Sequence, residues 1–179
     1  MLDDELGSVG DRPPDVVEVR PCSAEDLAEL RSTWPIAADV AGRHFARQRS
    51  GAQTLMVAWQ HGEAMGSVVI RWRSAELAEI GSRYPGVIEV AHLQVRSDHR
   101  RRGVGTCLMQ AAERQVRLRK APWIGLGVGV ENPQAAALYE HLGYIRTGLV
   151  ARSEYDFLDE NGVQRHAIEW NEYMIMDLR

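Results

Sequence analysis

The chain has 179 residues, 45% hydrophobic and 26% charged, a composition typical of a soluble globular protein with one domain. Its formal net charge of −4 argues against a dedicated nucleic-acid-binding protein. Cys22 and Cys107 do not have the spacing of a disulfide scaffold or a zinc site, so we expect no metal. The chain has no apolar run of transmembrane length, and its acidic N-terminus lacks secretory-signal features. We therefore expect a cytoplasmic protein with no nucleic-acid or membrane partner.

The whole chain is predicted to consist of a disordered leader at 1–14 and one domain over 15–179. Ser23, followed three residues later by Asp26, resembles a capping box and predicts a helix that ends near Trp34. The other elements expected in the N-terminal half are a strand at 16–20, a helix at 39–49, and a hairpin of strands at 52–60 and 64–73. Residues 74–86 are expected to be irregular.

The C-terminal half alternates strands and helices more regularly. The expected elements are a strand at 87–95, a helix at 103–120, a strand at 123–130, a helix at 133–142, and strands at 144–157 and 163–178. Asn161-Gly162 predicts a tight turn between the last two strands, because Asn-Gly is a strong hairpin signal. Asn132, Pro133 and Gly143 suit the N-cap, the first turn and the C-terminal end of the 133–142 helix.

The segment between the 87–95 strand and the 103–120 helix, His99 to Thr106, reads HRRRGVGT. A helix start leaves backbone N–H groups without internal partners and carries partial positive charge. Gly103 and Gly105 have no Cβ, so a phosphate can approach the main chain. The arginines at 100–102 raise the local positive potential. The segment therefore predicts a diphosphate-binding site.

Two common phosphate motifs are excluded by spacing. A dinucleotide fingerprint needs a third glycine where the chain has Leu108, and the P-loop pattern does not occur. The remaining pattern, Arg100-x-x-Gly103-x-Gly105, resembles the acyl-CoA-binding motif of the GNAT N-acetyltransferase superfamily. Taken alone, the same pattern also fits an ordinary strand-to-helix turn with solvated arginines.

A second block strengthens the resemblance. From Asn132 to Tyr144 the chain reads NPQAAALYEHLGY, which is similar to the second GNAT signature at every marked position. Both signatures occur in family order, about thirty residues apart, and the resemblance is clear over residues 52–150. It implies a single α/β (α+β) domain. The implied sheet is mixed and mostly antiparallel, with a splayed central parallel pair and flanking helices.

The resemblance also implies acetyl-CoA as co-substrate, with its pantetheine arm in the gap between the splayed strands. Asn132 caps its helix and is also within reach of the pantetheine amides. The residues expected to bind the cofactor, several through their backbone, are Leu93, Val95, Arg100, Arg101, Arg102, Gly103, Val104, Gly105, Thr106 and Asn132.

Two residues are the leading catalytic candidates. Glu89 stands in an apolar run before the phosphate loop, where burial disfavours a charged carboxylate, and it matches the general-base position of some family members. The competing interpretation is a surface or structural ion pair. Tyr139 falls in the second signature, where family members use a tyrosine hydroxyl as general acid; the alternative is a packed aromatic residue.

Two further residues are weaker candidates. His92 would point to the opposite face from Glu89 in a regular strand, although a bulge could reverse this. Cys107 fits a packed helix face better than a nucleophile, so we expect direct attack in a ternary complex.

The predicted function is acetyl-CoA-dependent N-acetylation of a primary amine on a small molecule. Acidic residues Glu154, Asp156, Asp159 and Glu160 would favour a cationic acceptor such as an aminosugar, antibiotic or polyamine if they overhang the site. The alternatives are a non-catalytic acyl-CoA sensor on the same fold and a protein N-acetyltransferase. A homodimer is expected by analogy with the family.

Overall fold

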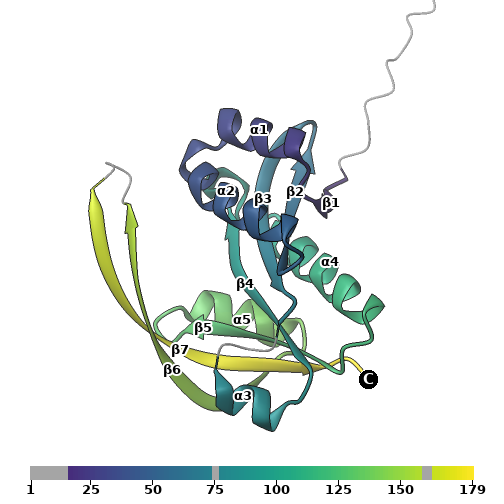
Figure 1. The fold of residues 1–179 in the computed structure, drawn as a ribbon, viewed down its shortest axis with the longest axis vertical. Coiled ribbons are helices and arrows are strands. Elements are labelled where there is room, and N and C mark those ends of the chain that lie inside the picture. Colours follow the sequence, from purple (N-terminus) through teal and green to yellow (C-terminus); the bar gives the residue numbers. More distant parts are fainter. Residues whose placement is uncertain (1–15, 74–76, 159–162) are drawn as a thin grey trace, which may run out of the picture.

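A computed structural model describes residues 16–73, 77–158 and 163–179, which form one mixed α/β domain (Figure 1). Its sheet has the strand order β1-β2-β3-β4-β5-β7-β6, and every neighbouring pair is antiparallel except β4 with β5. The strands are β1 (Glu18–Pro21), β2 (Gln53–Gln60), β3 (Glu63–Arg71), β4 (Val87–Val95), β5 (Trp123–Gly129), β6 (Ile145–Leu158) and β7 (Gln164–Asp177). The helices are α1 (Ala24–Thr33), α2 (Pro35–Arg49), α3 (Ala78–Arg83), α4 (Val104–Leu118) and α5 (Pro133–His141), and Ser97–His99 form a 3₁₀ turn.

The strands and the four longer helices lie close to their predicted positions, so the predicted fold class is confirmed. The expectation of an irregular 74–86 segment is wrong in part, because α3 forms there. This helix has only six residues, too few for a helical period to be visible in the sequence. Ile80 anchors it by packing, fully buried, against Tyr173 and Ile175. The predicted leader and the Asn161-Gly162 turn lie outside the described residues.

The central parallel pair is splayed. β4 and β5 pair only at Val87↔Trp123, Ile88↔Ile124 and Glu89↔Gly125. Beyond this point both strands continue, β4 to Val95 and β5 to Gly129, and Figure 1 shows them diverging. The gap begins at Glu89, which confirms the splay that the family resemblance implies.

The two faces of the sheet are covered differently. On one face, α4 and α5 lie over a large continuous core that includes Leu108, Met109 and Tyr139. On the other face, one apolar cluster lies under α1 and α2, and a separate one lies under α3. Side chains alternate along a strand, so Arg71 and Glu89 lie on the same face as Val69 and Val87, which belong to those two clusters. A polar strip therefore separates the clusters.

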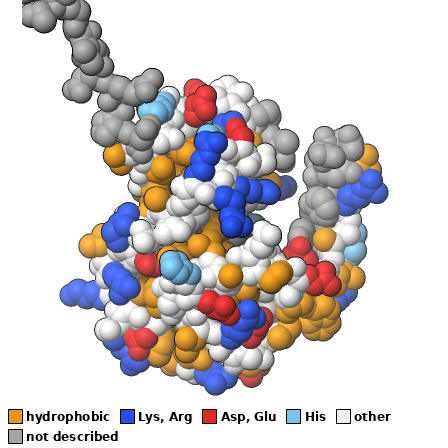
Figure 2. Space-filling view, turned by 180° about the vertical axis from the view of Figure 1, so that it is seen from behind, with side chains coloured by type: hydrophobic (Ala, Val, Ile, Leu, Met, Phe, Trp, Pro, Cys, Tyr) orange, Lys and Arg blue, Asp and Glu red, His pale blue; other side chains and the backbone are white. Residues whose placement is uncertain are grey.

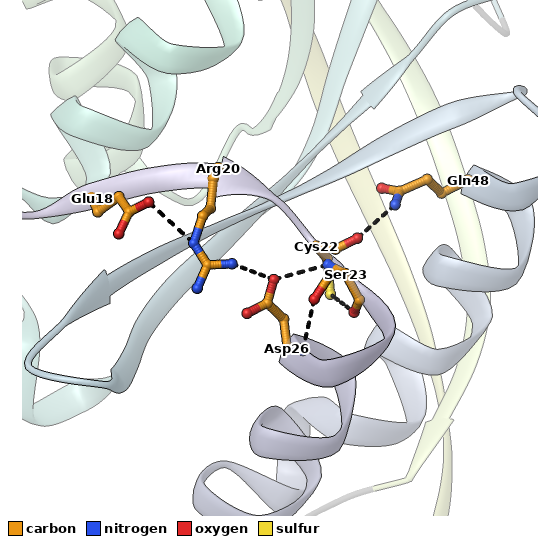
Figure 3. Close-up of polar contacts among 6 residues, drawn as sticks. All are labelled: Glu18, Arg20, Cys22, Ser23, Asp26 and Gln48. Atoms are coloured by element: carbon orange, nitrogen blue, oxygen red, sulfur yellow. Dashed lines mark hydrogen bonds and ion pairs between the residues drawn. The ribbon is translucent and has the colours of Figure 1, made fainter.

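The junction of β1 and α1 is held by charged and polar contacts (Figure 3). Ser23 caps α1 by accepting from the Asp26 N–H at 3.0 Å, while Asp26 accepts from the Ser23 N–H at 2.9 Å. The Arg20 guanidinium donates to the same Asp26 carboxylate. Gln48 of α2 donates to the carbonyl of Cys22 at 2.7 Å and accepts from the Leu55 N–H at 2.8 Å, which ties α2 to this junction and to β2. The predicted capping box is confirmed.

In the described parts of the chain, no helix combines the length and the apolar character that crossing a membrane requires.

Asp26→Asn is expected to lower the free energy of unfolding at pH 7 by about 2 kcal/mol, because Arg20 and Ser23 lose their ionised partner. Burial raises the pKa of Asp26, but its hydrogen bonds from Arg20 and Ser23 lower it further, so the net pKa lies below its ordinary value. This stabilisation is therefore present above the unfolded pKa, about 3.9, and is lost as the pH falls through the folded pKa.

Urea denaturation of both proteins between pH 7 and pH 3 measures the effect, with exposed Glu25→Gln in the same helical turn as control. The difference between wild type and D26N should shrink at the acid end. A deficit that does not change with pH would contradict this assignment.

Candidate active site

The predicted phosphate loop forms an open helix N-terminus. After β4 ends at Val95, the chain turns through Ser97–His99 and reaches Gly103, the N-cap of α4, which has a left-handed φ of +81°. Gly103 has no side chain to cap the helix, and the N–H groups of residues 104–106 precede the first intrahelical donor, Cys107, which bonds Gly103 at 3.0 Å. These amides and the helix dipole are suited to an anion.

The two glycines of this loop serve different purposes. At Gly103 the positive φ itself requires glycine, while the space around its Cβ position is open. At Gly105 an added Cβ would lie 3.4 Å from Leu138 and about 4 Å from side chains of Val95 and Leu93. Gly105 thus marks the place where the start of α4, the end of β4 and α5 come together. The two predicted motifs meet there.

The other residues of the loop differ in whether their side chain or only their backbone can contact a ligand. Arg101 and Arg102 are exposed, and Arg101 has a φ of +61°. Arg100 is also exposed, and its Nε donates to the carbonyl of Val95 at 3.1 Å. Val104 is buried in the core, so only its backbone can serve a ligand, while Thr106 is half-buried.

Tyr139 lies on α5, whose start is capped as predicted. The Asn132 side-chain oxygen accepts from the Ala135 N–H at 3.1 Å, and Pro133 occupies the first turn. Tyr139 is 7% exposed, and its ring meets that of Tyr144 edge-on at 6.0 Å. Burial raises the pKa of Tyr139 to about 12, so its hydroxyl is protonated at neutral pH and can act only as a proton donor or a hydrogen-bonding group.

Glu89 is 8% exposed and forms an ion pair with Arg71, whose NH1 lies 2.7 Å from Oε1. Its burial agrees with the prediction of a general base. The ion pair with Arg71 agrees equally with the competing interpretation, a structural ion pair. The Arg71 guanidinium favours the ionised carboxylate, which is the form that can accept a proton. Arg71 comes from β3, eighteen residues earlier, and no local sequence pattern indicates this pairing.

His92 lies on a β-bulge, which is one of the two arrangements that the sequence left open. β3 advances two residues, from Ser67 to Val69, while β4 advances three, from Ala91 to Gln94. His92 adopts a φ of +52° within this bulge. Its Nε2 consequently lies 3.3 Å from NH2 of Arg71, the same guanidinium that contacts Glu89.

A second histidine, His44 of α2, extends this polar group. Its ring lies 4.6 Å from that of His92, and its Nδ1 is 2.9 Å from Gln53 Nε2. Burial lowers the pKa of His44 to about 4, so it is neutral at physiological pH. Both histidines line a small pocket between α2 and the sheet, together with Ser67 and Gln94. A single histidine in a helical segment gives no sequence signal for such a role.

The acidic group predicted near the late hairpin is described only in part. Glu154 lies 2.5 Å from the Arg152 guanidinium and 3.1 Å from His166 Nε2, so its carboxylate already has partners within the chain. The side chain of Asp156 and residues 159 and 160 lie outside the part of the chain that the structure describes. Figure 2 shows the molecule hollowed between the part carrying α1 and α2 and the projecting β6–β7 arm, with basic side chains at the upper edge of the hollow.

Solved acetyltransferases share this fold. An N-acetyltransferase from Staphylococcus aureus Mu50 matches with a TM-score of 0.67 and 14% identity, over 92% of this chain and 99% of that one. The protein yncA from Salmonella typhimurium, assigned as an acetyltransferase and solved with acetyl-CoA, matches with a TM-score of 0.64 and 18% identity, over 92% and 95%. Nourseothricin acetyltransferase matches with a TM-score of 0.55 and 25% identity, over 73% and 68%.

Comparison with curated protein sequences gave no match. The family model for the acetyltransferase (GNAT) family matches residues 20–144, which is more than half of the chain and includes both motifs. The open α4 N-terminus and the splayed β4–β5 pair lie within this range. The chain therefore belongs to the GNAT acetyltransferase family.

Proposed function

We propose that the protein is an acetyl-CoA-dependent N-acetyltransferase that acetylates a primary amine of a small molecule by direct attack in a ternary complex. The observation that carries this proposal is the gap between β4 and β5, which opens past Glu89 and reaches the end of β4, where the uncapped start of α4 lies against Leu93 and Val95. The likeness to nourseothricin acetyltransferase supports a small-molecule acceptor.

The residues present suit coenzyme A. Its diphosphate would bind the amides of Gly103, Val104, Gly105 and Thr106, with Arg100, Arg101 and Arg102 supplying positive charge. Its pantetheine arm would lie along the backbone of Leu93 and Val95 and near Asn132, as an added strand does. The Val95 carbonyl already accepts from Arg100. If Arg100 turns to the diphosphate, it releases that carbonyl for the pantetheine arm.

The co-substrate would supply the acetyl thioester, and two residues of this chain would move protons. Glu89, paired with Arg71, would accept the proton that the amine loses as its nitrogen bonds to the acetyl carbon. Tyr139 would give its hydroxyl proton to the sulfur as the carbon–sulfur bond breaks. Its high pKa keeps that proton in place until the thiolate develops.

The direct test measures thiol release from acetyl-CoA with a panel of amines, including aminosugars, polyamines, amino acids and a peptide with a free N-terminus. The proposal expects saturable release with at least one small amine. Saturable binding of acetyl-CoA with no release on any amine would instead identify a sensor. Release on the peptide alone would identify a protein N-acetyltransferase.

Tyr139→Phe is expected to lower kcat at least tenfold, a barrier increase of about 1.4 kcal/mol, because the leaving thiolate loses its proton donor. The change removes only a hydroxyl, so acetyl-CoA affinity by calorimetry should stay within about twofold of wild type, well under 1 kcal/mol. Unaltered turnover would remove Tyr139 as the acid.

Glu89→Gln is expected to lower kcat/KM at pH 7 at least tenfold, about 1.4 kcal/mol. The remaining rate should rise only toward the pKa of the free amine, about 10.4, because an amine deprotonated in solution needs no base. Arg71→Gln breaks the same ion pair but keeps the carboxylate. If Glu89 is only structural, kcat/KM should depend on pH in the same way in E89Q and R71Q. If Glu89 is the base, only E89Q should show a kcat/KM that rises toward the pKa of the free amine.

A further inference from the structure

A row of polar side chains crosses three strands beside the small pocket under α2. Gln53 of β2, Arg71 of β3 and Glu89 of β4 are consecutive cross-strand partners, so their side chains lie on one face of the sheet. Neighbouring strands are about 4.8 Å apart, so the backbones of Gln53 and Glu89 are about 10 Å apart, with Arg71 between them. Gln53 contacts His44, which lines the pocket. The pocket therefore adjoins the carboxylate that would take the proton of the amine.

His44 presents a fixed hydrogen-bond donor to this pocket. Gln53 Nε2 donates to the His44 carbonyl at 2.9 Å and lies 2.9 Å from His44 Nδ1. An amide oxygen would repel that carbonyl, so the amide nitrogen faces both atoms and Nδ1 accepts. Because His44 is neutral, its single ring proton is on Nε2. This atom keeps accessible surface and bonds no described residue, so a ligand in the pocket can accept from it.

The charges around His44 favour an anion. Burial is the main cause that lowers the pKa of His44, and the charges of His92, Arg47 and Arg71 lower it further. Arg47 follows His44 by three residues, so it lies on the same side of α2. It is exposed and forms no ion pair with a described residue. Arg71 is balanced by Glu89, so Arg47 leaves a net positive charge. The basic side chains at the edge of the hollow in Figure 2 agree with this.

We propose that the acceptor is an amino acid, whose carboxylate binds between His44 and Arg47 while its amino group meets Glu89. His44 would donate to the carboxylate from Nε2, and Arg47 would supply the positive charge. The pocket is small, so it admits a carboxylate but not a sugar ring. This inference names the acceptor class and rests on the proposed N-acetyltransferase function.

The test compares each amino acid of the amine panel with its primary amide, which keeps the amine and the side chain but lacks the negative charge. In wild type, kcat/KM for the best amino acid should exceed that for its amide at least tenfold. Arg47→Gln should lower kcat/KM for the amino acid at least fivefold, chiefly through KM, and leave that for the amide within about twofold. Arg49→Gln, also exposed and in the last turn of α2, is the control and should match wild type with both acceptors.

His44→Asn shortens the side chain and withdraws the Nε2 donor from the pocket. It should lower kcat/KM for the amino acid at least fivefold, with little change for the amide and with acetyl-CoA affinity within about twofold of wild type. An equal loss with both acceptors, or a lower melting temperature with weaker acetyl-CoA binding, would show that His44 is only structural.

The remaining outcomes separate the inference from the proposed function. If wild type acetylates amines but prefers amides or polyamines, or if R47Q affects both acceptors equally, the carboxylate does not bind here and the inference alone fails. If wild type releases no thiol with any amine, the proposed function fails and the inference fails with it.

Discussion

The early end of pairing between β4 and β5 is the constraint on which the candidate site depends. Two parallel strands that lie side by side hydrogen-bond for only three residue pairs and then part. Each strand is held from its other side, β4 by β3 and β5 by β7, so the sheet stays continuous while its centre opens. The bulge at His92 adds one residue to β4 just past the opening, and a bulge increases local twist.

The opening brings together groups from segments far apart in the chain. Gly105 places the start of α4 against β4 and α5, which puts the helix amides at one end of the gap and the Tyr139 helix beside it. On the other face, Arg71, Glu89 and His92 form one contact group where the strands separate. One irregularity of the sheet thus positions both the open start of α4 and the polar residues.

Local features could be predicted from the sequence because their physical causes are local. The Ser23 capping box, the Asn132 cap and the glycines at 103 and 105 stand beside the elements they shape, and all lie at helix starts. The Arg71–Glu89 pair and the His92 bulge depend on strand register and cross-strand neighbours, which a single sequence does not encode locally. α3 could not be predicted, because six residues are too few to show a helical repeat of apolar residues.

The most direct test of the account is a titration of ¹⁵N-labelled protein with coenzyme A, followed by amide NMR spectra. The account predicts the largest shifts at residues 103–106, where helix amides meet the diphosphate, and along the β4 and β5 edges facing the gap, 93–95 and 126–129. Small shifts there, with large ones at another surface or none at all, would contradict it.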